Sequence, residues 1–114
     1  MNLTFRDQTS GKLGAVTLEG VLTVARADEL RMLLIKALID SDSVQVDFGP
    51  VAEVDLSCLQ LLCAAHRSAG RIKRGFSLSA DWPDRFKQTV EEAGYARLAG
   101  CRFDADHSCL WIKR

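Results

Sequence analysis

The chain has 114 residues, which is the size of one ordinary domain that can bury a hydrophobic core. Hydrophobic residues make up 47% and charged residues 26%, and the 15 Lys and Arg residues balance the 15 Asp and Glu residues. This balance excludes the basic surplus that is typical of nucleic-acid-binding proteins and of polybasic membrane-binding patches, so we expect no nucleic-acid partner.

The first predicted elements are two strands. Residues 13–20 (LGAVTLEG) include β-branched residues, show a partly alternating pattern of side chains and end in Glu-Gly. These features are typical of a strand. Residues 4–8 can pair with them through the turn Thr9-Ser10-Gly11. The chain is therefore expected to begin with a hairpin.

Residues 25–40 have the period of a helix. Thr23 or Asp28 is a candidate cap for its start, since both side chains can accept hydrogen bonds from free backbone N–H groups. One arc of the helix carries the expected core residues Ala27, Leu30, Leu33, Leu34, Ala37 and Leu38. A second apolar group lies off this arc and consists of Met32, Ile35 and Ile39. It either closes the core under the following strand or forms a contact surface.

The middle of the chain contains a strand followed by a helix. Residues 43–49 alternate apolar and polar side chains and stop at Gly49-Pro50, which predicts a strand. Residues 55–69 are predicted to form a second helix, which Gly70 closes.

The last third contains one more strand and one more helix. Residues 75–80 are a predicted short strand, and residues 83–95 a predicted helix with Pro83 in its first turn and Gly94 at its C-cap. Residues 108–112 either form a last strand or pack as a short tail. Strands that alternate with helices predict an α/β domain with a sheet that is at least partly parallel.

The helix over residues 55–69 is apolar around most of its circumference, and Ser57 begins its polar seam. The other members of the polar seam, all within about 80° of Ser57 on the helical wheel, are Gln60, Ala64, Arg67, Ser68 and Arg71. We expect a heavily buried helix with this seam open to solvent. Asp55 is the predicted N-cap, so Ser57 would lie beside free N–H donors and the positive end of the helix dipole, where a phosphate is stabilised.

The residues alone leave the role of Ser57 open. A serine in a first helical turn often does no more than satisfy its own hydrogen bonds. A nucleophile would need a base, and the sequence places neither His66 nor His107 beside Ser57 and has no G-x-S-x-G elbow. His66 is expected to be a packed, hydrogen-bonded histidine. We predict no catalytic residue, metal site or cofactor.

Four cysteines are present, and no pair has C-x-x-C spacing. They are Cys58, Cys63, Cys101 and Cys109. Each lies among apolar residues, where a free cysteine behaves as a small hydrophobe. We expect four reduced packing residues, with a metal or redox role as the alternative.

No segment of the sequence is typical of membrane insertion or of secretion. No apolar run approaches the roughly 18 residues of a spanning helix. The first twelve residues contain no apolar segment of a secretory signal. We therefore expect a single cytoplasmic domain over residues 1–114 without membrane insertion.

The layout resembles the STAS domain family, in its anti-sigma-factor-antagonist group, over nearly the whole chain. The stretches that carry the resemblance are residues 18–38, residues 44–67 and the tripeptide Ala-Gly-Tyr at 93–95. The family opens a helix with Asp-x-Ser-Gly-Leu, which reads Asp55-Leu56-Ser57-Cys58-Leu59 here. Thr23 stands where the family often has an acid that contacts the phosphorylation site.

The resemblance implies a STAS-like fold, with a mixed sheet of four to five strands packed against helices on one side. It implies a regulatory module, and no enzyme, that binds a GHKL-type serine kinase acting as an anti-sigma factor. The kinase would phosphorylate Ser57, in an environment formed by Asp55, Cys58 and Thr23, and a PP2C-type phosphatase would reverse this. The expected partner-binding residues are Met32, Ile35, Gln60, Ala64 and Arg67.

A second reading of the same resemblance contains no switch. In it, the chain is a STAS subunit or accessory domain of a larger assembly. Examples of such an assembly are a lipid-type ABC transporter and a chemotaxis-type signalling cluster.

Overall fold

A computed structural model describes residues 1–9 and 11–93 of the chain. Its strands are β1 Asn2–Gln8, β2 Gly11–Leu22, β3 Ser43–Val54 and β4 Gly75–Leu78. Its helices are α1 Ala27–Asp40, α2 Leu56–Arg71 and α3 Asp84–Glu92, and a short 3₁₀ turn, η1 Val24–Arg26, precedes α1. The predicted residues Gly94, Cys101, His107 and Cys109 and the predicted segment 108–112 lie outside the described residues.

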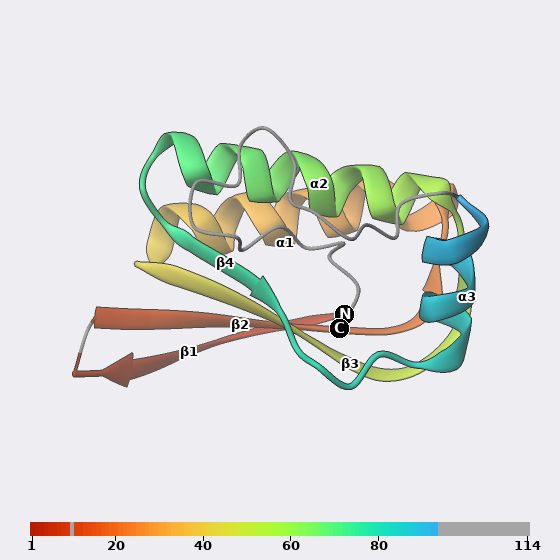
Figure 1. The fold of residues 1–114 in the computed structure, drawn as a ribbon. Helices are drawn as coiled ribbons and strands as arrows, with labels where there is room; N and C mark the ends of the chain where they lie inside the picture. Colours follow the sequence, from red (N-terminus) through yellow and green to blue (C-terminus); the bar gives the residue numbers. More distant parts are fainter. Residues whose placement is uncertain (10, 94–114) are drawn as a thin grey trace.

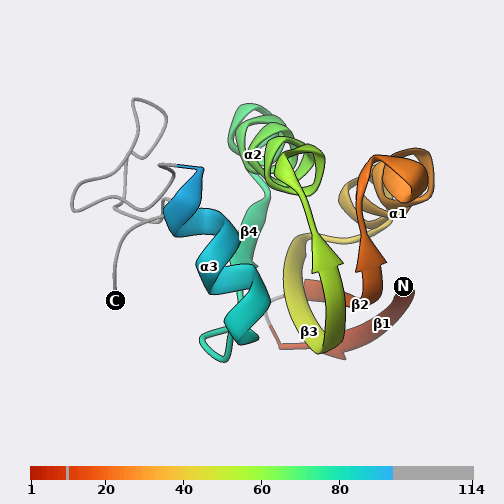
Figure 2. The same cartoon turned by 90° about the vertical axis from the view of Figure 1, so that its right-hand side faces the viewer.

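The four described strands form one mixed sheet in the order β1-β2-β3-β4. β1 and β2 are antiparallel, with Phe5 opposite Gly14, so the predicted hairpin is confirmed. β2, β3 and β4 are parallel, and α1 and α2 are the crossovers that connect them. Both helices lie side by side over one face of the sheet, while α3 lies at its end beside the later half of β3 (Figure 1, Figure 2). The predicted α/β fold is confirmed.

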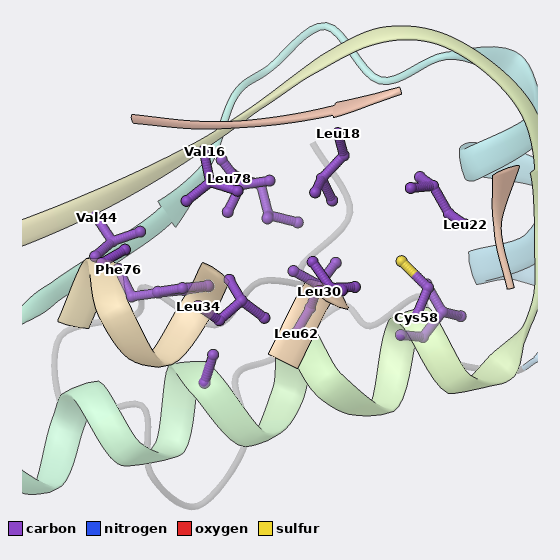
Figure 3. Close-up of a cluster of buried hydrophobic side chains, with 14 of the residues drawn as sticks. Val16, Leu18, Leu22, Leu30, Leu34, Val44, Cys58, Leu62, Phe76 and Leu78 are labelled. Carbon is purple, nitrogen blue, oxygen red and sulfur yellow. The ribbon is translucent and has the colours of Figure 1, made fainter. Parts of the chain in front are cut away.

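The core lies between this sheet face and the two long helices (Figure 3). Alternate strand residues point into it because successive side chains of a strand face opposite sides. The strands contribute Val16, Leu18, Val44, Val46, Phe76 and Leu78. The helices contribute Leu30, Leu34, Ala37, Leu38, Cys58, Leu59, Leu62, Ala65 and Ala69. Burial of each Leu or Val stabilises the fold by about 1.5–3 kcal/mol before entropy is counted.

Strand β3 continues past its predicted end at Gly49-Pro50. Its register against β2 shifts on both sides of Gly20, which has a φ of +75°. A bulge of this kind leaves a residue outside the hydrogen-bond ladder, so Pro50, which has no N–H, is tolerated there. β4 ends opposite Val46, and beyond that point the ring of Phe86 from α3 packs on Phe48 at 4.5 Å between centroids.

Helix α2 also continues past its predicted end, through Gly70 to Arg71. The residue in the left-handed region is Lys73, with a φ of 56°. The N–H of Arg74 donates to the carbonyl of Ala69 at 2.8 Å, and that of Lys73 to Gly70 at 3.4 Å. These two bonds are those of a Schellman motif, which satisfies the last carbonyls of the helix. The prediction that Gly70 closes the helix is therefore wrong.

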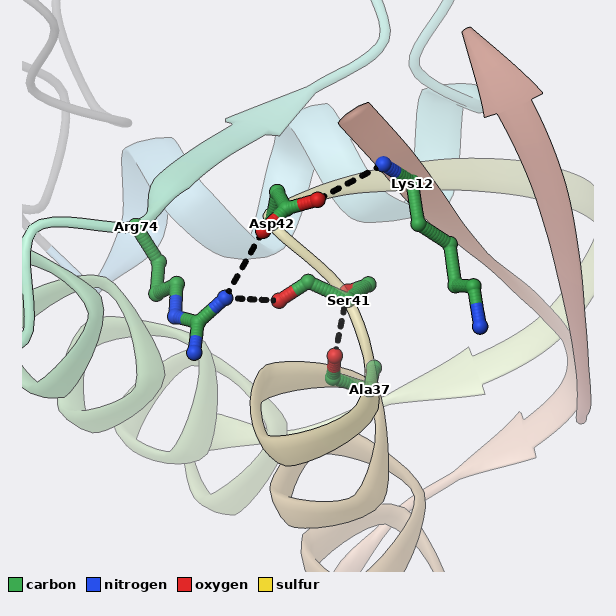
Figure 4. A network of polar contacts seen from close by, with 5 residues as sticks. All are labelled: Lys12, Ala37, Ser41, Asp42 and Arg74. Atoms are coloured by element: carbon green, nitrogen blue, oxygen red, sulfur yellow. Dashed lines mark hydrogen bonds and ion pairs between the residues drawn. The ribbon is translucent and has the colours of Figure 1, made fainter. Parts of the chain in front are cut away.

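A polar network joins the amino ends of the parallel strands to the helices (Figure 4). The carboxylate of Asp42 accepts from the backbone N–H of Lys12 at 2.8 Å and from the guanidinium of Arg74 at 3.2 Å. Arg74 also donates to the carbonyl of Ser41 at 2.8 Å, and the Ser41 hydroxyl donates to the carbonyl of Ala37. The network fixes the end of the sheet that is opposite to Ser57.

Candidate functional site

Asp55 begins helix α2 and binds the candidate serine. Its Oδ1 accepts from the backbone N–H of Ser57 at 2.9 Å and also from the Ser57 hydroxyl. Asp55 has extended backbone dihedrals, as an N-cap residue requires. The predicted N-cap is confirmed, and it holds Ser57 in the first turn of α2.

The same carboxylate also caps the 3₁₀ turn η1. Oδ2 of Asp55 accepts from the backbone N–H of Val24 at 2.9 Å, and the Asp55 N–H donates to the carbonyl of Leu22 at 3.2 Å. The residues predicted to cap the start of this helix do not do so, because the N-cap residues of η1 and α1 make no capping hydrogen bond with their own side chains. Thr23 and Asp28 are therefore not the caps, and a residue from a distant part of the chain takes this role.

The environment of Asp55 changes its acidity. Partial burial acts to raise the pKa of this carboxyl. The hydrogen bonds from the Ser57 hydroxyl and from the backbone N–H groups of Val24, Ser57 and Cys58 outweigh burial, and the pKa is lowered from 3.8. A carboxylate with a lowered pKa is a poor base for activating a serine, so this Asp–Ser pair is unlike a nucleophile–base pair.

Ser57 lies at the carboxyl ends of the parallel strands β2 and β3. A small hollow there is lined by Met1, Leu22, Thr23, Arg26, Ala27, Leu30, Ser57, Cys58 and Leu61. The structure thus brings Thr23 and Ser57 together, as predicted. Arg26, which the sequence analysis did not select, lines the same hollow, and its guanidinium pairs with Glu29 at 2.6 Å. Its only sequence signal is its place at the start of the predicted helix 25–40.

The comparisons with known proteins identify the family. A family model described as "Mlab, STAS domain" matches residues 5–100. The chain belongs to the STAS domain family. Among solved structures, it is similar to the anti-sigma factor antagonist SpoIIAA in its unphosphorylated form, with a TM-score of 0.57 and 17% sequence identity. That match covers 82% of this chain and 96% of the other, and it shows that the fold is shared. No curated protein matches the chain.

In this STAS domain the residue after the motif serine is Cys58, whose side chain points into the core (Figure 3). Cys58 is only 2% exposed, and burial, helped by the charge of Asp55, raises the pKa of its thiol to about 12. It is therefore a packing residue, as expected. Cys63 is half-buried.

Helix α2 is less buried than its apolar sequence predicts. Gln60, Ala64 and Arg67 of the polar seam are exposed, as expected. Leu56, however, the first residue of the helix, is 45% exposed. His66 packs against Phe76 with 6.3 Å between ring centroids, which confirms that it is packed, as one part of its prediction had it.

The apolar residues off the core arc of α1 do not close the core. Met32 is 61% exposed, Ile35 39% and Ile39 68%. Met32 and Ile39 lie on the side of α1 opposite to its buried residues, because positions three and four apart share a helix face. The helices α1 and α2 lie side by side over the sheet (Figure 2), and these residues of α1 and the seam residues Gln60, Ala64 and Arg67 of α2 are all exposed.

Two further observations concern the described residues, 1–9 and 11–93. None of their helices is long and apolar enough to cross a lipid bilayer. Their His, Cys, Asp and Glu side chains do not gather in groups of three or more that could hold a metal ion.

Proposed function

We propose that this STAS domain is a regulatory protein-binding module that acts like an anti-sigma factor antagonist. Reversible phosphorylation of Ser57 switches it. The partner is a GHKL-type serine kinase that also serves as the anti-sigma factor, and a PP2C-type phosphatase removes the phosphate. The observation that carries the proposal is the position of the Ser57 hydroxyl, in the first turn of α2 on a hollow and beside exposed apolar side chains.

The hydroxyl has an environment that suits a phosphate. A phosphoserine carries about −1.5 to −2 charges, and the positive end of a helix dipole stabilises them. Arg26, whose side chain is positively charged, lines the same hollow. The exposed side chains of Val24 and Leu56 flank Asp55, so a dianion beside them would weaken an apolar contact with a partner.

The partner surface proposed here spans the outer faces of α1 and α2. Its residues are Met32, Ile35, Gln60, Ala64 and Arg67. Exposed apolar side chains on α1 supply the area that binding needs, and the polar seam on α2 supplies hydrogen-bond groups. Ile35→Glu is expected to weaken partner binding about tenfold or more. Phe5→Glu is the matched control, because Phe5 is equally exposed, at 39%, on β1.

Phosphorylation is tested with the purified chain, ATP and its cognate GHKL-type kinase. Mass spectrometry is expected to find one phosphate, at Ser57, which Ser57→Ala abolishes. Ser68→Ala is the control, since Ser68 is an exposed serine on the same helix. Phosphate on another residue, or none with an active kinase, would contradict the proposal.

The second candidate is a STAS subunit of a larger assembly, without a switch, such as a component of a lipid-type ABC transporter or of a chemotaxis-type cluster. Two observations favour it. The matching family model carries the description "Mlab" and not that of an antagonist, and Cys58 replaces the glycine of the antagonist motif. Calorimetry with Ser57→Asp separates the candidates: weaker binding supports the switch, and unchanged binding supports the fixed subunit.

A further inference from the structure

One carboxylate holds the starts of two helices together with the hydroxyl of Ser57. Oδ1 of Asp55 accepts from the N–H and the hydroxyl of Ser57, and Oδ2 accepts from the N–H of Val24 at 2.9 Å. Ser57 and Val24 therefore bond to the two oxygens of one carboxylate, although they lie on different elements. Whatever displaces this carboxylate also removes the cap of η1.

We infer that Asp55 transmits the phosphorylation state of Ser57 to the turn formed by residues 23–26. When Ser57 carries a phosphate, Asp55 withdraws from the N–H of Val24, and the turn changes its position. This inference rests on the proposed function, because it takes Ser57 as the modified residue.

The chemistry of the modification requires Asp55 to respond. In the transfer, the Oγ–H bond of Ser57 breaks and its proton passes to a general base of the kinase and then to water. Oγ bonds to the γ-phosphorus of ATP as the bond from that phosphorus to the bridging oxygen breaks, and ADP departs. Ser57 thereby loses the proton that it donates to Asp55 and gains a dianion next to the same carboxylate. Like charges at this distance repel, and the phosphate also competes for the N–H groups at the start of α2.

A second charged group acts on the same turn. Arg26 ends η1, lines the hollow beside Ser57 and is held by Glu29 through two bonds, at 2.6 and 2.9 Å. A dianion attracts a guanidinium more strongly than one carboxylate does. Asp28 and Glu29 in the first turn of α1 would repel the phosphate. The withdrawal of Asp55, the attraction of Arg26 and the repulsion of the acids in α1 therefore all act on residues 23–26 and the start of α1.

The consequence is a change of shape at the partner surface in addition to a change of charge. Val24 is 72% exposed and Leu56 45% exposed, and each is the first residue of a helix that Asp55 caps. Release of Val24 moves one apolar side chain relative to the other. A partner that recognises both in the unmodified form would then lose one of its two contacts.

The inference is tested on the full chain with phosphoserine installed at position 57 during translation. Amide spectra and hydrogen exchange are compared with those of the unmodified protein. The Val24 amide is expected to exchange about tenfold faster after modification, because it has lost its acceptor. The Lys12 amide, which is bonded to Asp42 at the other end of the sheet, serves as the internal control. An unchanged Val24 amide would overturn the inference.

Two variants test whether the charges on Asp55 and on the phosphate cause the change at Val24. Asp55→Asn carries no charge and has one acceptor oxygen, which can accept from the N–H of Val24 only when the amide NH₂ faces Ser57. In the phosphorylated variant this NH₂ can donate to the phosphate, so the amide oxygen is expected to stay on Val24 and its N–H to remain protected. Ser57→Ala without phosphate should also leave it protected. An equal loss of protection in phosphorylated Asp55→Asn and in phosphorylated wild type would overturn the role of Asp55. If Asp55→Asn does not fold, the wild-type comparison decides by itself.

The result is independent of any kinase, since the phosphate is installed during translation. A kinase that leaves Ser57 unmodified contradicts the proposed function alone. An exchange rate of the Val24 amide that is unchanged by the installed phosphate contradicts the inference alone.

Discussion

The carboxylate of Asp42 binds the backbone N–H of Lys12 at 2.8 Å, across thirty positions of the chain. The contact places the end of α1 against the start of β2 and leaves no room for a side chain at Gly11, whose φ is +128°. A Cβ on Gly11 would collide with the carboxylate of Asp42. The hairpin and the helical layer are therefore joined at a point that only glycine fits.

Gly11→Ala is expected to destabilise the protein by about 1–3 kcal/mol, from the positive φ and the collision together. Urea unfolding followed by circular dichroism measures the change. Gly70→Ala is the matched control, because Gly70 is helical and a Cβ there meets no atom within 4 Å. It should stabilise by about 0.5–1 kcal/mol. Destabilisation by Gly70→Ala would contradict the observed end of α2.

Lys73→Gly is expected to stabilise the protein by about 1 kcal/mol, because Lys73 occupies the left-handed region at the end of α2. The same unfolding measurement applies. Lys87→Gly, at an exposed position inside α3, should instead destabilise by about 1 kcal/mol. Equal effects at the two lysines would show that the Schellman motif does not form.

Asp55→Ala should destabilise the protein by about 1–3 kcal/mol, since it removes the N-cap of α2 and the acceptor of Val24. Asp28→Ala removes an acid from the first turn of α1 that makes no capping hydrogen bond, and should cost only about 0.3–1 kcal/mol. Unfolding free energies at neutral pH compare the two. A cost at Asp28 equal to that at Asp55 would argue against the double cap.

The lowered pKa of Asp55 predicts how its contribution depends on pH. The folded protein binds the proton less well than the unfolded chain, so the stabilisation is fully present above pH 3.8 and is lost as the pH falls through the lower folded pKa. Wild type should therefore lose more unfolding free energy than Asp55→Asn in acid. Parallel pH profiles of the two proteins would contradict this prediction.

Cys58 is expected to resist alkylation in the native protein, because its thiol is buried and has a pKa of about 12. Iodoacetamide labelling followed by peptide mass spectrometry measures this. Labelling of Cys58 should appear only after unfolding in urea, whereas half-buried Cys63 should react earlier. Rapid native labelling of Cys58 would show that the start of α2 opens readily.

Local patterns in the sequence were sufficient for much of this domain. The hairpin, the core arc of α1 and the cap from Asp55 to Ser57 depend on residues that are close in the chain. The hairpin and the cap are confirmed, and so is the core arc except at Ala27 and Leu33, which are only half-buried. Alternation and helical period report which side of an element is apolar. They therefore predicted the α/β fold and the position of Ser57 at a helix start.

Elements that depend on spatial neighbours could not be predicted in this way. β3 runs past Pro50 because of a bulge against β2 and because α3 covers the edge beyond β4. α2 ends at a left-handed lysine and not at Gly70, since the N–H groups of Lys73 and Arg74 bond back to the carbonyls of Gly70 and Ala69. Apolar character alone also overestimated the burial of α2, because a helix on one sheet face leaves its outer side in water.

The candidate site shows the same division. The sequence by itself determined that Asp55 caps α2 and holds Ser57, because an N-cap reaches only two residues along the chain. Only the tertiary structure decided that the second oxygen of Asp55 reaches Val24 and that Arg26 shares the hollow with Ser57. The physical reason is that parallel strands bring the loops at their carboxyl ends together, whatever their separation in sequence.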